Sequence, residues 1–166
     1  MEAERFINKV ENSGIVALDL IDFKSGLEIV AFDIKDHLYM ELIVKEKEFK
    51  QSVAGLDLTV YKNKAVAVFC TVDTIIPTWV FMYLADKLYT SAAFVDFKSV
   101  SELQTDLWKS NLSSADLSHF KAQKVVVRAR PGIPPALFIL ATNLLKSLAK
   151  TIMYGEIGMP KVISKN

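Results

Sequence analysis

The sequence predicts a three-layer α/β protein, in which helices cover both faces of a mixed, mainly parallel sheet. Two observations support this prediction: one segment of the chain occurs twice, and in each copy an apolar strand pattern is followed by a helical pattern and a second strand. Strands that alternate with helices are joined by right-handed crossovers, which make neighbouring strands parallel. At 166 residues, the chain is expected to form a single domain over residues 1–166.

The recurring segment spans about residues 57–97 in the first copy and 116–154 in the second. Both copies open on the pattern Asp-Leu-(Ser/Thr)-x-aromatic-Lys, and farther along Ile76-Pro77 matches Ile133-Pro134. Unrelated strand-helix pairs share apolar runs, but they have no reason to share this polar opening. We therefore interpret the segments as two repeated βαβ units that diverged from one ancestor.

The chain before the first copy predicts two helices and a hairpin. Residues 3–11 have a helical pattern. Residues 15–20 and 27–33 are β-rich runs with a short polar connection, so an antiparallel N-terminal hairpin is expected at the sheet edge. A long charged helix is expected over residues 35–54, where Gly55 ends it.

Within the copies, each pattern predicts a strand, a helix and a closing strand. Glu102 follows Ser99 by three residues, which predicts a capping box at the start of the helix that links the copies. The final residues, 155–166, have no regular pattern. Strands are expected at 65–71, 92–97, 124–129 and 150–154, and helices at 77–89, 99–108 and 134–148.

Composition and charge argue against several classes of partner and compartment. The formal net charge of +1 gives no electrostatic reason to expect nucleic acid. The longest apolar runs are too short to span a membrane and contain Thr, Asn or Pro. Glu2, Glu4 and Arg5 occupy positions where a signal peptide would be apolar, so a cytoplasmic protein is expected. Cys70 is the only cysteine, which suits a reducing compartment.

The predicted topology also predicts where a ligand would bind. In parallel sheets the ligand crevice lies beyond the carboxyl ends of the strands, and the loops after the repeat strands are expected to meet there in one crevice. No metal and no cofactor are expected, because His37 and His119 have no ligand spacing with Cys70. The predicted ligand-binding residues are Thr71, Asp73, Thr74, Asp96, Arg128, Arg130 and Glu156.

Each of these residues also has a plain structural interpretation. Cys70 is a weak catalytic candidate with Asp73, but a lone cysteine at the end of an apolar strand is usually a small core residue. Asp73 and Thr74 precede a helix whose free amides they can cap. Arg128 and Arg130 are expected to point to opposite faces, which argues against a clamp of two arginines on one anion. Either arginine alone suits a carboxylate or a phosphate.

Four short strings of the sequence carry a resemblance to a known family. They are Phe-Asp-Ile-Lys-Asp at 32–36, Lys-Glu-Lys-Glu-Phe at 45–49, Ile-Ile-Pro-Thr-Trp at 75–79 and Ile-Met-Tyr-Gly-Glu at 152–156. Through these strings the chain resembles an uncharacterised bacterial family, domain of unknown function family 2480, over nearly its whole length. The resemblance implies a link to iron–sulfur or sulfur metabolism, and further cysteines in many members. Arg130 and Gly158 occupy the approximate places of those cysteines here, and one thiolate cannot hold a cluster without other ligands.

Three functions are compatible with these observations. The sequence has no dinucleotide-binding, P-loop, hydrolase or zinc-protease motif, so we favour a non-enzymatic binding or accessory protein. The first alternative is a small-molecule enzyme with Cys70 as nucleophile, and the second is a structural protein-interaction domain. A homodimer is expected as well, because the helical patterns over 79–84 and 136–145 are apolar on all sides and a sheet covers only one.

Overall fold

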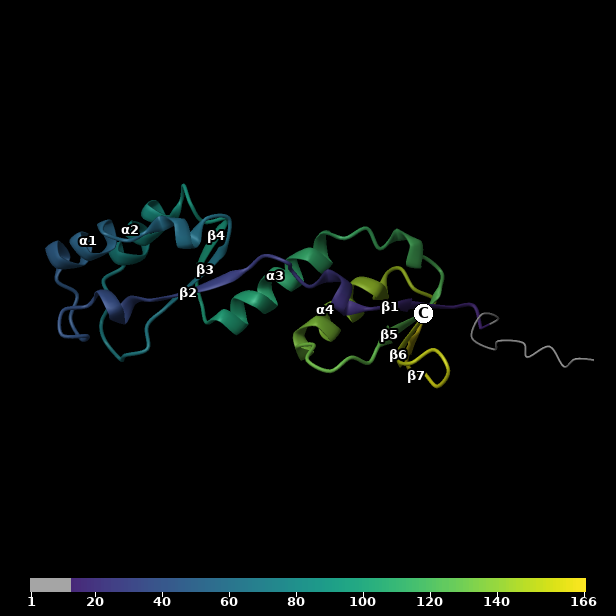
Figure 1. Cartoon of the computed structure of the whole chain (residues 1–166). Coiled ribbons are helices and arrows are strands. Elements are labelled where there is room, and N and C mark those ends of the chain that lie inside the picture. The colour runs from purple at the N-terminus through teal and green to yellow at the C-terminus, as the bar shows by residue number, and fades with distance from the viewer. Residues whose placement is uncertain (1–12) are drawn as a thin grey trace, which may run out of the picture. The chain divides into compact units, whose positions relative to one another are not determined.

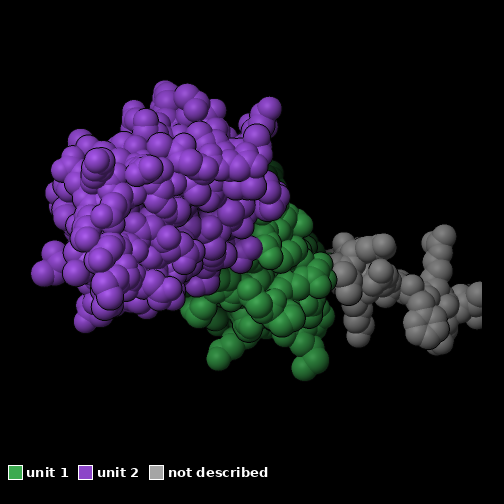
Figure 2. Space-filling model, turned by 60° about the vertical axis from the view of Figure 1, so that its left-hand side comes forward, with its two compact units in different colours: residues 1–25, 105–166 green, residues 26–104 purple. Residues whose placement is uncertain are grey.

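The computed structural model describes residues 13–166, which form two compact units with one sheet each (Figures 1 and 2). Unit 2 comprises residues 26–104, whereas unit 1 comprises the residues up to 25 together with 105–166. Unit 2 is therefore an insertion between two segments of unit 1. The predicted helix over residues 3–11 lies outside the described residues, and the single domain over residues 1–166 stays a prediction.

Unit 2 contains a parallel sheet with the strand order β2-β3-β4. The middle strand, β3, is apolar on both faces, and four of its five residues are buried. It therefore needs a neighbour on each side, as central parallel strands do. The elements are β2 (Ile29–Asp33), η2 (Ile34–His37), α1 (Glu46–Ala54), η3 (Leu58–Tyr61), β3 (Ala65–Phe69), α2 (Trp79–Leu88) and β4 (Phe94–Phe97).

The core of unit 2 lies between this sheet and its two α-helices. Three apolar side chains at four-residue spacing on helix α2 face the core: Val80, Leu84 and Leu88. Each of them is at most 1% exposed. Helix α1 adds Phe49 and Val53 to the same cluster. Full burial of such side chains stabilises the fold by about 1.5–3 kcal/mol each.

Unit 1 contains the strand order β1-β5-β6-β7, in which β1, β5 and β6 are parallel and β7 is antiparallel to β6. Helix α4 places Leu137, Ala141 and Leu145 in the core, and Trp108 Nε1 donates a buried 2.7 Å hydrogen bond to the Leu20 carbonyl. Helix α3 (Val100–Ser114) begins in unit 2 and continues into unit 1 at residue 105. The other elements are β1 (Ile15–Leu18), η1 (Leu20–Phe23), η4 (Ser118–Phe120), β5 (Lys124–Arg128), α4 (Pro135–Lys146), β6 (Thr151–Gly155) and β7 (Lys161–Lys165).

The two units share local details at corresponding positions. Asn63 and Ala122 precede β3 and β5, with left-handed φ values of 59° and 60°. The Asn63 amide donates to the Ser91 carbonyl at 2.9 Å, and the Ala122 amide donates to the Leu148 carbonyl at 2.8 Å. Each turn is thereby tied to the segment that follows the helix of its own unit.

Several predictions are confirmed. The chain has an α/β fold with mainly parallel strands, and the closing strand of the second copy exists as β6, parallel to β5. The capping box forms as predicted: the Ser99 amide donates to Glu102 Oε2 at 2.9 Å, and the Glu102 amide donates to Ser99 Oγ at 3.3 Å. Over residues 13–166, no helix combines the length and apolar character needed to cross a bilayer.

The prediction of an antiparallel N-terminal hairpin is wrong, and so is the prediction of a single sheet. Strands β1 and β2 do not pair with each other; β1 pairs in parallel with β5, and β2 with β3. Both β3 and β5 are apolar central strands with two edges to satisfy. Strand β1 pairs with one edge of β5, and β2 pairs with one edge of β3. A hairpin between β1 and β2 would leave both of these edges unpaired.

Two boundaries also differ from the sequence prediction. The helix expected over residues 35–54 covers only Glu46–Ala54, because Met40 and Glu41 have left-handed φ values of 52° and 58° that an α-helix cannot contain. The segment 155–166, expected to be irregular, contains β7. This edge strand is mostly exposed, so it lacks the apolar alternation that would have revealed it.

Candidate functional site

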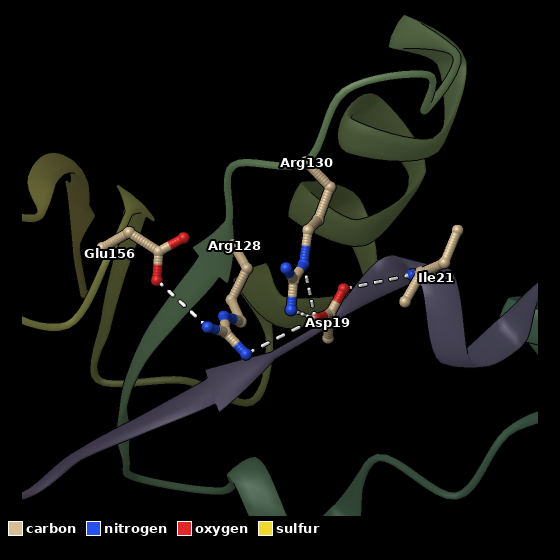
Figure 3. Close-up of polar contacts among 5 residues, drawn as sticks. All are labelled: Asp19, Ile21, Arg128, Arg130 and Glu156. Carbon is tan, nitrogen blue, oxygen red and sulfur yellow. Dashed lines mark hydrogen bonds and ion pairs between the residues drawn. The ribbon is translucent and has the colours of Figure 1, made fainter.

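Four charged side chains gather at the carboxyl ends of three neighbouring strands of unit 1 (Figure 3). Asp19 directly follows β1, Arg128 ends β5 and Glu156 directly follows β6. Arg130 lies two residues beyond Arg128, in the loop before α4. Asp19 also begins the η1 turn, since its carboxylate accepts a 3.3 Å hydrogen bond from the Ile21 amide.

Asp19 is the centre of this cluster. Arg130 Nε and Nη2 donate to Asp19 Oδ2 at 2.9 and 2.7 Å, and Arg128 Nη1 lies 3.6 Å from the same oxygen. Arg128 also donates from Nη2 to Glu156 Oε2 at 3.2 Å. Hydrogen bonding by Arg130 lowers the pKa of Asp19 below its ordinary value, which outweighs the opposing effect of burial, and the charge of Arg128 adds to it.

The expectation that Arg128 and Arg130 diverge is wrong. Both side chains point towards Asp19 (Figure 3). Residues two apart on an extended segment share a face, so the spacing itself brings the two guanidinium groups together.

The positive and negative charges of this cluster are equal in number. Two guanidinium groups face two carboxylates, so an incoming anion must displace a carboxylate of the protein. Glu156 is the weaker partner, because its side chain is 56% exposed whereas that of Asp19 is 12% exposed. The buried Nε of Arg128 has no hydrogen-bond acceptor within the described chain. In its present form the cluster ties β1, β5 and β6 together.

The corresponding edge of unit 2 uses neutral partners. Asp33 is the last residue of β2, whereas Asp19 directly follows β1. Asp33 accepts from the Thr71 amide at 3.1 Å and from Thr71 Oγ1 at 2.5 Å. Its carboxylate also accepts from the Lys35 amide at 3.0 Å. Burial alone would raise the pKa of Asp33, but the hydrogen bonds from Thr71 and Lys35 outweigh it and lower the pKa.

The remaining predicted residues are distributed around unit 2. Asp96 forms a 2.9 Å ion pair with Lys98, whose hydrogen bond lowers the pKa of Asp96. Thr74 Oγ1 donates to the Leu42 carbonyl at 2.5 Å. Asp73 is exposed, and Cys70 is half-buried against the apolar core of the unit.

The predicted residues therefore do not share one sheet edge. Thr71, Asp73, Thr74 and Asp96 belong to unit 2, while Arg128, Arg130 and Glu156 belong to unit 1. The reason is that each copy closes its own sheet with its own N-terminal strand. Ligand binding by these residues stays a prediction.

Sequence reasoning missed the two aspartates that organise these edges. Asp19 and Asp33 are the acceptors for Arg130 and Thr71. A signal was present: both follow Val-Ala and a large apolar residue, as Val-Ala-Leu-Asp at 16–19 and Val-Ala-Phe-Asp at 30–33. The N-terminal strands thus also carry a recurring motif.

A second feature of unit 2 was also missed, a tight turn with apolar residues on its surface. The Leu42 amide donates to the Tyr39 carbonyl at 3.1 Å, and the Tyr39 amide donates to the Ile43 carbonyl at 2.8 Å. The two central residues, Met40 and Glu41, are both left-handed, as in the tightest hairpin turns. Asparagine and glycine normally fill such positions.

We call the exposed apolar side chains of this turn, together with the neighbouring Ile75, the turn surface. Met40 is 73% exposed and Ile75 is 90% exposed. Ile75 is held near the turn by Thr74, the residue before it, which bonds to Leu42. Lys45 Nζ lies 3.1 Å from the centre of the Tyr39 ring and supports the turn. The turn surface consists of Tyr39, Met40, Leu42, Ile43 and Ile75.

Comparison with known proteins identifies a family. The model of the family described as "Protein of unknown function (DUF2480)" matches residues 4–163. The chain belongs to this family, as its resemblance implied. No curated protein and no solved structure matches it.

Proposed function

We propose that this DUF2480 member is a non-enzymatic accessory protein that binds another protein through the turn surface. The observation that carries the proposal is Met40, a large apolar residue that is 73% exposed and left-handed at once. An exposed methionine adds nothing to the core, and asparagine or glycine would adopt this backbone at lower cost. A docked partner would give the methionine a use, because an exposed apolar side chain on a hydrogen-bonded turn is suited to insertion into a partner's pocket.

The left-handed backbone of this turn has an energetic cost. Placing an L-residue in the left-handed region costs roughly 1–2 kcal/mol, and this turn does so at both Met40 and Glu41. Strained backbone of this kind persists where surrounding contacts hold it and is concentrated at functional sites. Here the Tyr39 to Ile43 bridge and the 3.2 Å ion pair between Lys35 and Glu41 supply those contacts.

The charged edges favour the same conclusion. The arginines of unit 1 are paired with Asp19 and Glu156, and Asp33 of unit 2 is engaged by Thr71. These groups are committed to holding strands together, whereas the side chains of the turn surface face solvent. The runner-up function, an enzyme with Cys70 as nucleophile, is disfavoured by the packing of Cys70 against the core.

A matched pair of variants tests the proposal. Met40→Asn suits the left-handed backbone and removes the apolar side chain, so it should preserve or raise stability while reducing capture of a partner by a photo-crosslinker at Ile43. The control, Met159→Asn, removes a methionine that is 91% exposed in unit 1 and should leave capture unchanged. Binding must then be reproduced with the purified partner. Equal loss in both variants, or none in either, would refute the turn surface as the docking site.

A second measurement separates the enzymatic alternative. The rate at which a thiol reagent modifies Cys70 in the folded protein should be slow, because the residue is half-buried in the apolar cluster. Fast modification, with Asp73→Ala altering the rate, would favour the nucleophile instead.

We further infer that the protein acts in the cytoplasm and forms a homodimer, and that its two units descend from a duplicated βαβ unit. The matching left-handed turns at Asn63 and Ala122 support the duplication. A role in iron–sulfur or sulfur metabolism rests on the family resemblance alone.

A further inference from the structure

The outer edge of β4 distinguishes the two sheets. In unit 1, β6 pairs with β5 on one side and with the antiparallel strand β7 on the other. In unit 2, the corresponding strand β4 pairs with β3, and within the described residues no strand pairs with its other edge. One row of backbone donors and acceptors is therefore available for a further strand.

An apolar groove runs beside this edge, between β4 and α2. Its two ends share Ala85 and Val95. Phe94 and Phe97 on the strand are 43% and 53% exposed, and Tyr89 at the end of the helix is 83% exposed. The apolar residues that line or flank the groove are Val68, Phe81, Leu84, Ala85, Tyr89, Ala92, Ala93, Phe94, Val95 and Phe97.

Unit 1 shows what this groove accepts. The corresponding pocket lies between β6 and α4, where Val127, Phe138 and Ile152 stand in the places of Val68, Phe81 and Val95. There, Ile163 of β7 completes the lining. The scaffold thus binds an antiparallel strand at this edge and places an apolar side chain of that strand beside the groove.

We propose that β4 of a second copy of the chain adds antiparallel to β4 and forms a symmetric dimer through unit 2. A two-fold axis perpendicular to the sheet makes two copies of one strand antiparallel, which is the orientation of β7 on β6. The proposal rests on the homodimer inferred above and names its surface.

The composition of β4 favours its own copy as the occupant. Edge strands that must stay unpaired are commonly protected by short length, charge or proline. Strand β4 is short and carries Asp96, but the charge of Asp96 is paired with Lys98 at 2.9 Å, and no proline interrupts the strand. Its exposed Phe94 and Phe97 are the residues that need cover, and pairing two copies covers both sets at once. A two-fold pair closes on itself, so this contact does not propagate to a third copy.

The helices contribute unequally to this surface. Helix α4 turns one strongly exposed apolar residue outward, Ile139 at 65%, and its other apolar residues are buried or partly buried against the core of unit 1. Helix α2 exposes Met82 at 74% and leads to Tyr89, which flanks the groove. The sequence predicted an interface on one or both of the helices α2 and α4. The exposed residues favour the side of α2.

Sedimentation equilibrium of matched variants tests the interface. Phe94→Lys places a charge at the paired edge and should weaken dimerisation at least tenfold, and Tyr89→Lys, at an exposed position, should also weaken it without risk to the core. Ile139→Lys is the control and should leave the dissociation constant within twofold. Circular dichroism checks that each variant is folded.

Hydrogen exchange gives an independent readout, because backbone amides on the outer edge of β4 should slow as the protein concentration rises through the dissociation constant. Three results would overturn the inference. A wild-type chain that stays monomeric at high micromolar concentration refutes the homodimer and this interface with it. A dimer that both β4-side variants leave intact refutes only the interface, as does a dimer disrupted by Ile139→Lys alone. The binding function of the turn surface is separate, and Met40→Asn tests it.

Discussion

Unit 1 and unit 2 use the same succession of a strand, a 3-10 turn, a helix, a second 3-10 turn, a central strand, a second helix and an outer strand, but they complete it differently. Unit 1 covers its outer strand β6 with β7. Unit 2 leaves β4 open and instead carries the exposed turn between η2 and α1. The same scaffold thus has a paired β6 edge in unit 1 and an open β4 edge in unit 2. Both surfaces that we propose for binding lie where unit 2 departs from unit 1.

The polar edges differ in the same instructive way. Asp19 of unit 1 accepts from two arginines, whereas Asp33 of unit 2 accepts from Thr71 and backbone amides. An aspartate at the end of the N-terminal strand is common to both. What changes is the charge of its partner, and hence its sensitivity to pH and salt.

The largest expected effect comes from the buried aromatic that each unit draws from the helix before its central strand. Trp108→Ala in unit 1 and Phe49→Ala in unit 2 should each cost about 3–5 kcal/mol of unfolding free energy. Trp108→Phe isolates the bond to the Leu20 carbonyl and should cost about 1–3 kcal/mol, because that buried acceptor loses its donor. Urea denaturation measures all three. A Trp108→Phe protein as stable as wild type would show that the bond adds nothing.

The two aspartates give the next largest difference. Asp19→Asn removes a carboxylate bonded to cations and should cost about 1.5–3 kcal/mol. Asp33→Asn loses bonds from uncharged donors only, and the amide oxygen of asparagine can still accept one of them, so it should cost about 1 kcal/mol. The folded pKa of Asp19 is lowered, so its contribution is present above the unfolded pKa of about 3.9 and is lost as pH falls through the folded value. Below pH 4 the stability gap between wild type and Asp19→Asn should therefore shrink. A gap independent of pH would contradict the ionic account.

The two left-handed residues Asn63 and Ala122 can each be replaced by the other residue type, with a smaller expected effect on stability. Asn63 and Ala122 have the same φ, but asparagine tolerates the left-handed region better than alanine. Ala122→Asn should stabilise unit 1 by about 0.5 kcal/mol, and Asn63→Ala should destabilise unit 2 by a similar amount. Both positions are exposed, so packing changes little. Shifts of the same sign in the two variants, measured by denaturation midpoint, would break the correspondence.

The smallest effect is expected at Glu156. Its ion pair with Arg128 is exposed, and such pairs contribute about 0–1 kcal/mol. Glu156→Gln should therefore lower the unfolding free energy by less than Asp19→Asn does. Added salt should remove the difference in stability between Glu156→Gln and the wild type. A double-mutant cycle with Arg128→Gln measures the coupling; a coupling above about 2 kcal/mol would mean that the pair behaves as a buried one.

Local patterns predicted the central elements correctly. Strand β3 is a continuous apolar run and the three central residues of β5 are valines, and α2 and α4 have apolar stripes that bury Leu84 and Leu137. The edges were harder to predict. Strand β7 contacts solvent along most of its length, and the turn at Met40 runs against the usual preferences of its residues, so neither leaves a local signal.

The candidate site shows the same division. Arg128, Arg130 and Glu156 were predicted to lie at the carboxyl end of a sheet, because strand order along the chain sets that edge. Their main partner, Asp19, was missed because it lies 111 residues from Arg130 in the chain. No spacing rule links residues at that distance.

By itself, the sequence determined the alternation of strands and helices and the residues at the strand ends, because these depend on hydrophobic periodicity and turn chemistry within short segments. Only the tertiary structure decided which N-terminal strand joins which copy, and therefore that there are two sheets with Asp19 in one and Asp33 in the other. The physical reason is that strand pairing joins backbone groups that are interchangeable between chemically similar strands. The choice among partners then depends on the packing of the whole unit, which no local pattern contains.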